Sequence, residues 1–212
     1  LPQANVRYIG KIGNDVFGNF VLKQTSHSPL NSPFFVHSNT EPTGIGHVRK
    51  FPDGQYDTVV FEGANRTLRA EDIEQGLTRF GQPEWIVTNL ESPLAIIAEV
   101  AAKRSETKLA LNLSPLTSET SIALAVADLL VLNEGEARYL ADLDSSADIH
   151  AVVEYLVQES NAIVVVTLGE AGALGLEPGG TTIQVNAVPT EVISTLGAGD
   201  TFFGALMYAY IS

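Results

Sequence analysis

The sequence predicts an α/β fold with a mostly parallel central sheet flanked by helices and a small antiparallel lid region. From about residue 85 onward, short apolar runs alternate with segments of helical period, a pattern typical of parallel strands joined by crossover helices. The 212 residues suit a single domain. Hydrophobic residues make up 45% of the chain and charged residues 17%, which indicates a globular rather than a disordered protein.

The region before this alternating part is predicted to form antiparallel ribbons. Residues 34–62 contain two strand-like runs, 46–51 and 56–61, and Pro52-Asp53-Gly54 supplies a turn between them. Ribbons beside a parallel sheet often form a lid or a small second layer. We therefore expect lid ribbons at about 34–62, within one domain that spans residues 1–212.

Four apolar runs in the second part of the chain predict buried strands, and helical segments fill the intervals. Ser92-Pro93 suits the N-cap and the first position of the first of these helices. Pro178-Gly179-Gly180 predicts a hairpin within residues 171–188, and a last helix is expected from about Asp200. The strands are expected at 85–90, 109–113, 128–132 and 162–168, and the helices at 92–104, 120–127, 134–141 and 147–159.

Composition and charge argue against several classes of partner. The chain has 25 acidic and 12 basic residues, a formal net charge of −13, so its surface should repel phosphate backbones. We therefore predict no nucleic-acid partner. We also predict no membrane partner, because the chain is acidic and contains no run of 18 apolar residues that could span a bilayer. The chain has no cysteine, which excludes disulfides and cysteine-based zinc sites and fits a reducing compartment. The predicted location is therefore cytoplasmic.

The sharpest chemical signal is Gly197-Ala198-Gly199-Asp200 before the last predicted helix. The glycines let the backbone turn tightly with its N–H groups exposed, and a following helix adds the positive end of its dipole. This combination forms an anion hole suited to a phosphoryl group in transfer, and Asp200 could take a proton from a substrate hydroxyl. A glycine-rich helix start with Asp200 as its N-cap explains the same residues equally well.

Two familiar nucleotide-binding patterns are absent from the sequence. The glycines at 13 and 18 have the spacing of a phosphate loop, but the Lys-Ser/Thr pair that should follow is missing. The glycines at 169, 172 and 175 do not form Gly-x-Gly-x-x-Gly, so a dinucleotide-dependent oxidoreductase is not predicted.

An ordered series of short motifs resembles the ribokinase-like (PfkB) carbohydrate kinases, and the ribokinase branch in particular. The Gly197–Asp200 segment, continued by Thr201-Phe202, resembles the family's C-terminal signature. The other motifs occur in family order across nearly the whole chain. They are residues 6–18, Thr43-Gly44, Gly63-Ala64-Asn65, Leu90-Glu91-Ser92-Pro93, Asn112-Leu113-Ser114-Pro115, Asn133-Glu134-Gly135-Glu136 and residues 167–172.

The resemblance implies ATP-dependent phosphoryl transfer to a sugar hydroxymethyl group. It favours a pentose such as ribose, and leaves nucleosides, fructose and other hexoses open. In this family Asp200 would be the general base that deprotonates the acceptor hydroxyl. Gly197, Ala198 and Gly199 would donate N–H groups to the moving phosphate.

The implied cofactors are ATP and Mg²⁺. Asn133 and Glu136 would organise the magnesium ion, with Glu136 acting through a water, which suits an ion that keeps several waters. Thr167 and Gly169 would line the nucleotide site at the carboxyl end of a strand. Glu91 would lie near the sugar. A helix cap for Asn133, a plain turn for Gly169 and a solvated loop acid for Glu91 are the alternatives.

The sequence departs from the family pattern in two respects. Ser194 stands where many members carry an aspartate that helps to bind a monovalent cation; a serine has no charge, so potassium activation is doubtful. The family's first strand, its Gly-Gly-x-x-x-Asn signature and its C-terminal segment have no counterpart here. We therefore expect a chain truncated at both ends, and a homodimer is one way to supply a strand. A truncated or degenerate, non-catalytic nucleotide-binding relative is the alternative function.

Overall fold

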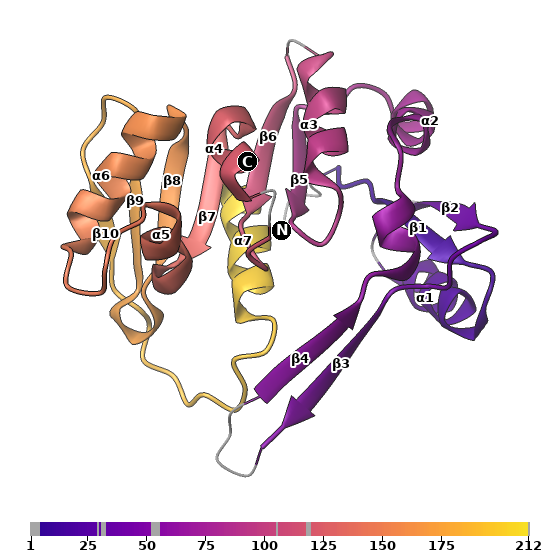
Figure 1. Ribbon diagram of the computed structural model, residues 1–212, viewed down its shortest axis with the longest axis horizontal. Coiled ribbons are helices and arrows are strands. Elements are labelled where there is room, and N and C mark those ends of the chain that lie inside the picture. The colour runs from indigo at the N-terminus through magenta and orange to yellow at the C-terminus, as the bar shows by residue number, and fades with distance from the viewer. Residues whose placement is uncertain are drawn as a thin grey trace. The chain divides into compact units, whose positions relative to one another are not determined.

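The computed structural model describes residues 5–28, 30, 33–51, 56–104, 106–117 and 120–211 (Figure 1). The chain divides into two compact units. Unit 1 comprises Leu1–Pro83 and Glu91–Val100, and unit 2 comprises Glu84–Leu90 and Ala101–Ser212.

Unit 2 contains a six-stranded, mostly parallel sheet, which confirms the predicted fold class. Its strand order is β10-β9-β8-β7-β6-β5. The four strands from β5 to β8 run parallel, while β9 is antiparallel to β8 and β10 to β9. The bounds are β5 Trp85–Asn89, β6 Lys108–Asn112, β7 Leu129–Asn133, β8 Ile163–Thr167, β9 Ala173–Leu176 and β10 Ile183–Val185.

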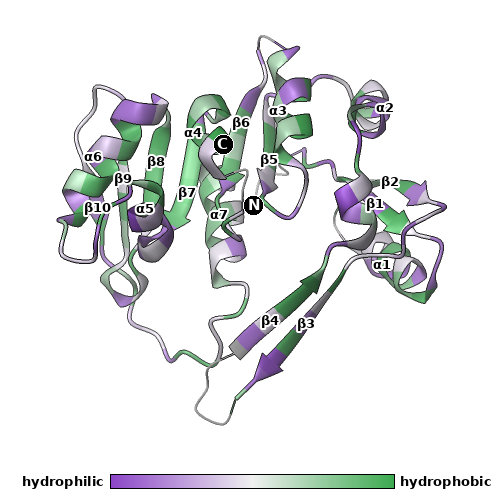
Figure 2. Ribbon diagram, in the orientation of Figure 1, coloured by the Kyte–Doolittle hydropathy of each residue, from purple (hydrophilic) through white to green (hydrophobic). Residues whose placement is uncertain are grey.

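The central strands are apolar along nearly their whole length because both faces of the sheet are covered. Figure 2 shows β6, β7 and β8 as largely hydrophobic, and Leu111, Leu130 and Val164 are fully buried. Continuous apolar runs of this kind are typical of parallel strands buried on both faces. The same runs made the strands predictable from the sequence, and each observed boundary lies within two residues of the predicted one.

Helices connect the parallel strands of unit 2. They are α4 (Thr120–Val126), between β6 and β7, and α5 (Glu134–Leu140) and α6 (Ile149–Ser160), between β7 and β8. The strands from β6 to β8 follow one another in a single direction across the sheet, so right-handed crossovers place these helices on one face.

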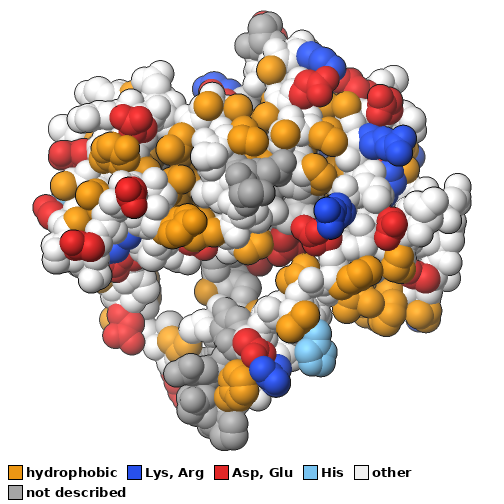
Figure 3. Space-filling view, in the orientation of Figure 1, with side chains coloured by type: hydrophobic (Ala, Val, Ile, Leu, Met, Phe, Trp, Pro, Cys, Tyr) orange, Lys and Arg blue, Asp and Glu red, His pale blue; other side chains and the backbone are white. Residues whose placement is uncertain are grey.

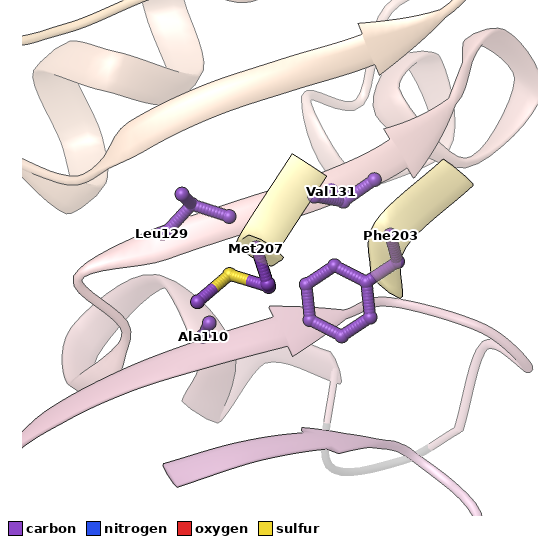
Figure 4. Close-up of a cluster of buried hydrophobic side chains, with 5 residues drawn as sticks. All are labelled: Ala110, Leu129, Val131, Phe203 and Met207. Atoms are coloured by element: carbon purple, nitrogen blue, oxygen red, sulfur yellow. The ribbon is translucent and has the colours of Figure 1, made fainter. Parts of the chain in front are cut away.

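The last helix, α7 (Ala198–Ile211), packs on the sheet through its apolar side chains. Figure 4 shows Phe203 and Met207 pointing toward Ala110 of β6 and toward Leu129 and Val131 of β7. Leu129 and Val131 are two residues apart and share one face of β7, whereas Leu130 and Leu132 face the other side. The sheet therefore carries a separate apolar layer on each face, and α7 closes one of them.

The described residues of unit 1 form two small two-stranded sheets. The first joins β1 (Ile9–Gly13) and β2 (Phe34–Ser38), and the second joins β3 (Ile45–Lys50) and β4 (Tyr56–Phe61). Its helical segments are α1 (Val16–Ser26), the 3₁₀ turn η1 (Gly63–Thr67), α2 (Ala70–Phe80) and most of α3 (Leu94–Ala102).

The predicted ribbon over 34–62 is only partly correct. The β3–β4 hairpin is antiparallel as expected, and its predicted turn at Pro52-Asp53-Gly54 lies outside the described residues. In contrast, β2 pairs in parallel with β1, so residues 34–38 do not belong to an antiparallel ribbon. The reason is the helical crossover α1 between the two strands, because parallel neighbours need such a connection.

A carboxylate network fixes the turn after β1 to the segment that leads into β3. The Oδ1 atom of Asp15 accepts hydrogen bonds from the Gly18 N–H (2.8 Å) and the Thr43 hydroxyl (2.8 Å), and Oδ2 accepts from the Thr43 N–H (2.7 Å). The Thr43 hydroxyl in turn accepts from the Gly13 N–H at 3.0 Å. These hydrogen bonds stabilise the charged form of the Asp15 carboxylate and therefore lower its pKa. The bond from the Gly18 N–H has the largest effect.

The described surface fits the acidic composition. Acidic side chains are spread across the face that Figure 3 presents. No helix in the described part of the chain is long and apolar enough to span a bilayer.

We expect Met207→Ala to loosen α7 and to lower the free energy of unfolding by about 2–5 kcal/mol, the usual cost of truncating a buried large side chain. Met207 is 4% exposed within the α7 cluster. Urea unfolding followed by circular dichroism measures the change. Gly204→Ala is the matched control, because Gly204 is exposed on the same helix with no atom within 4 Å of an added Cβ. The control should be neutral or stabilising; equal stability of the Met207→Ala chain and the wild type would contradict the assigned packing.

Candidate functional site

The four parallel strands of unit 2 each end in a polar residue. These residues are Asn89 on β5, Asn112 on β6, Asn133 on β7 and Thr167 on β8. The strand register places Asn89 beside Asn112 and Asn133 beside Thr167. Ligands of open α/β sheets bind outside the carboxyl ends of the strands. This edge of the unit 2 sheet is therefore the candidate functional site.

Asn133 and Glu136 hold each other in a reciprocal cap at the start of α5. The Asn133 Oδ1 accepts from the Glu136 N–H at 2.8 Å, and the Glu136 Oε2 accepts from the Asn133 N–H at 2.8 Å. This geometry confirms the helix-cap interpretation of Asn133. It also fixes the orientation of two oxygen-bearing side chains at the strand ends, whose chemistry suits magnesium.

Thr167 and Gly169 lie where β8 passes into a tight turn. The Thr167 hydroxyl donates to the Leu132 carbonyl at 3.3 Å, and Gly169 begins the 3₁₀ turn η2 (Gly169–Ala171). The turn closes through Gly172, whose φ of +97° and close approach to the Val185 carbonyl leave no room for a Cβ. The turn interpretation of Gly169 is thus confirmed, and its role toward a nucleotide stays a prediction.

The segment before α7 folds into a glycine turn that starts the helix earlier than expected. Gly197 has a φ of +75°, and its carbonyl accepts from the Thr201 N–H (2.9 Å) and the Thr201 hydroxyl (2.8 Å). The helix begins at Ala198, so Asp200 is its third residue. The alternative that Asp200 is the N-cap is therefore wrong: it lies within the first helical turn.

The start of α7 presents backbone donors in open surroundings. Residues 194–200 are all exposed, and no atom lies within 4 Å of a Cβ built on Gly197 or Gly199. The first N–H groups of a helix have no partner within it, so they are available to an anion. The Ala198 N–H is an exception, because it donates to the Thr195 carbonyl at 3.1 Å. Ser194 takes part in the same turn, since its Oγ accepts from the Leu196 N–H at 3.2 Å.

Asn112 contacts Asp200 across the sheet–helix interface. The Asn112 Nδ2 donates to the Asp200 Oδ1 at 3.4 Å, although the two residues lie 88 positions apart in the sequence. Asn112 stands in the motif Asn112-Leu113-Ser114-Pro115, for which the sequence predicts no role of this residue. The available signal was a polar residue that ends a buried apolar strand, a position that Asn133 also occupies.

Glu91 belongs to unit 1 and follows the segment that contains β5. Partial burial of the Tyr8 phenol raises its pKa, and the negative charge of Glu91 raises it further. Glu91 is itself exposed. Its predicted role near a sugar stays a prediction, as does the alternative of a solvated loop acid.

Comparison with known proteins relates this chain to carbohydrate kinases. The family model described as pfkB family carbohydrate kinase matches residues 3–212. A ribokinase of Staphylococcus aureus is 27% identical over 210 residues, which cover 97% of this chain and 68% of that protein. A ribokinase of Mus musculus is 29% identical over 213 residues, 97% of this chain and 65% of that protein. The chain thus spans about two thirds of the length of these relatives.

A solved structure shares the fold. The ribokinase of Arabidopsis thaliana, complexed with ribose and ATP, superposes with a TM-score of 0.78 at 24% sequence identity. The match covers 97% of this chain and 69% of that one.

We expect opposite effects on stability from Gly197→Ala and Gly199→Ala. The first puts a Cβ on a residue with a φ of +75° and should destabilise the chain by about 1–2 kcal/mol. The second replaces glycine within the first turn of α7, where nothing lies within 4 Å of the new Cβ, and should be neutral or stabilising by up to ~1 kcal/mol. Chemical unfolding of both variants measures the difference in stability. Equal unfolding midpoints would show that the backbone conformation at position 197 does not require a glycine.

Proposed function

Because the chain belongs to the pfkB family of carbohydrate kinases, we propose that it transfers the γ-phosphoryl group of ATP to a sugar hydroxymethyl group. The observation that carries this proposal is the position of Asp200. It stands in the first turn of α7, directly after the exposed glycine turn, and its carboxylate contacts the end of β6. A proton acceptor and a set of anion-binding N–H groups therefore lie within one helical turn.

The chemistry follows from these groups. The Asp200 carboxylate takes the proton of the acceptor hydroxyl as the hydroxyl oxygen forms its bond to the γ-phosphorus. The bond between that phosphorus and the β–γ bridging oxygen breaks, and ADP leaves with the electron pair. The N–H groups of Gly197 and Gly199 stabilise the charge on the transferring oxygens. For Ala198 to join them, its N–H must exchange its present bond to Thr195.

Magnesium would be held mainly by the phosphates of ATP, with Asn133 and Glu136 beside it. Amide and carboxylate oxygens are ligands that this ion prefers. Because the Glu136 Oε2 already accepts the hydrogen bond that caps α5, a contact through water suits this side chain. Within the described ranges no group of three His, Cys, Asp or Glu residues could hold a metal on its own. When bound, the ion would neutralise phosphate charge. The cap holds both side chains in a fixed orientation where β7 passes into α5.

The preferred acceptor in this proposal is a pentose such as ribose. Support comes from the two ribokinases matched over nearly the whole chain and from the Arabidopsis ribokinase that was solved with ribose and ATP. Thr167 and Gly169 would line the nucleotide site and Glu91 the sugar site.

Acceptor-dependent ATP consumption, measured with ribose, fructose, adenosine and no acceptor, tests the substrate class. Mg-ATP binding without acceptor-dependent turnover would instead favour a non-catalytic nucleotide-binding relative.

We expect Asp200→Asn to lower the turnover number by at least ~10²-fold, the scale of a lost general base. The amide keeps the size of the side chain but does not accept the proton. Steady-state ATP consumption with ribose measures the change. Asp142→Asn is a suitable control, because Asp142 is an exposed acid of the same unit with a φ of +53°, a conformation that asparagine tolerates. Turnover within a few-fold of wild type in Asp200→Asn would remove Asp200 from the mechanism.

Two variants of Asn133 separate its cap from its proposed role near magnesium. Asn133→Ala should cost about 1 kcal/mol of stability, because the cap of α5 is lost, whereas Asn133→Ser should retain most of it. If the Asn133 side chain also organises the ion, both variants should raise the Mg²⁺ concentration required for half-maximal activity. A serine variant with normal stability and a normal magnesium requirement would restrict Asn133 to the cap.

A further inference from the structure

Asn112 is a buried polar side chain at the end of an otherwise apolar strand. It is 7% exposed, while Leu109, Ala110 and Leu111 before it are at most 1% exposed. Burying a primary amide is unfavourable unless its groups are hydrogen-bonded. The hydrogen bond that the structure gives to the Asn112 amide nitrogen goes to Asp200. The buried amide of Asn112 therefore has the proposed general base, Asp200, as its hydrogen-bond partner.

The contact continues the apolar interface between α7 and the sheet. Asn112 lies two residues after Ala110 and so shares its face of β6, the face on which Phe203 and Met207 pack. Asp200, Phe203 and Met207 are spaced by three and four residues, so they follow one another along one side of α7. Asn112 and Asp200 thus form the polar end of a row of contacts that is otherwise apolar.

Both ends of this hydrogen bond are anchored independently of it. Asn112 is in the ladder between β5 and β7, and the Phe203–Met207 cluster holds α7 against β6 and β7. Because neither backbone needs the hydrogen bond to stay in place, its main effect is on the Asp200 side chain. A donor on Oδ1 restricts rotation of the carboxylate and leaves Oδ2 to accept a proton.

We propose that Asn112 is a positioning residue that holds the Asp200 carboxylate in the orientation needed to deprotonate the acceptor hydroxyl. This inference rests on the proposed function of Asp200 as the general base. Loss of the donor should lower the turnover number about tenfold or more, because misorientation of a reacting group costs rate without weakening substrate binding. The KM values for ATP and for the sugar should stay within about twofold of wild type.

Asn112→Leu and Asn112→Asp test the proposal. Leucine has a similar volume and is apolar, so it should preserve or raise the unfolding midpoint while it removes the donor. Aspartate is isosteric but puts a second carboxylate beside Asp200, so it should give the lower turnover of the two. A purely structural role would reduce activity only in proportion to the unfolded fraction, which circular dichroism measures on the same samples.

A double-mutant cycle tests whether Asn112 acts through Asp200. In the Asp200→Asn background, Asn112→Leu should cause no further loss of turnover, because the carboxylate that it positions is gone. A full tenfold loss in that background, or a folded Asn112→Leu chain with wild-type turnover, would overturn the positioning role and leave the proposed function intact. A wild-type chain without acceptor-dependent turnover would overturn both.

Discussion

The packing of Phe203 and Met207 against β6 and β7 is the interaction on which the candidate site depends. Residues 194–200 are exposed throughout, so the glycine turn has little burial of its own to fix it. Truncation of one such buried side chain typically costs about 2–5 kcal/mol, a large fraction of the stability of a small domain. The helix that this cluster anchors sets the position of the first-turn N–H groups and of Asp200. In the proposed function, the anion-binding groups are therefore oriented before any substrate arrives, the condition under which such groups stabilise a transition state most effectively.

The strand ends combine structural and chemical roles in the same atoms. Asn133 and Glu136 satisfy each other's backbone N–H groups, and Asn112 hydrogen-bonds Asp200. Each polar group is thus held by a bond that folding already forms; in the proposed function this reduces the conformational freedom that ligand binding would have to remove. In the proposed function, Asn133 and Glu136 would act both as the cap of α5 and as site residues.

Local patterns predicted most of unit 2, and long-range pairings explain what they missed. The strands from β5 to β8 were predictable because burial on both faces makes them continuously apolar. The partner of β2 was not, since its parallel pairing depends on a crossover rather than on its own residues. The start of α7 was placed two residues late because the left-handed conformation of Gly197 lets the helix begin at Ala198. Asn112 received no role because its partner is 88 positions away.

We propose that the carboxyl ends of the strands in unit 2 and the start of α7 form one nucleotide-binding edge. The most direct test is a titration of the ¹⁵N-labelled 212-residue chain with Mg-ATP, followed through its amide resonances by NMR. We expect the amide resonances of five residues to shift together along one saturable binding curve: Gly197, Gly199, Asn133, Thr167 and Gly169. Saturable shifts confined to residues outside this edge, with these amides unchanged, would contradict it.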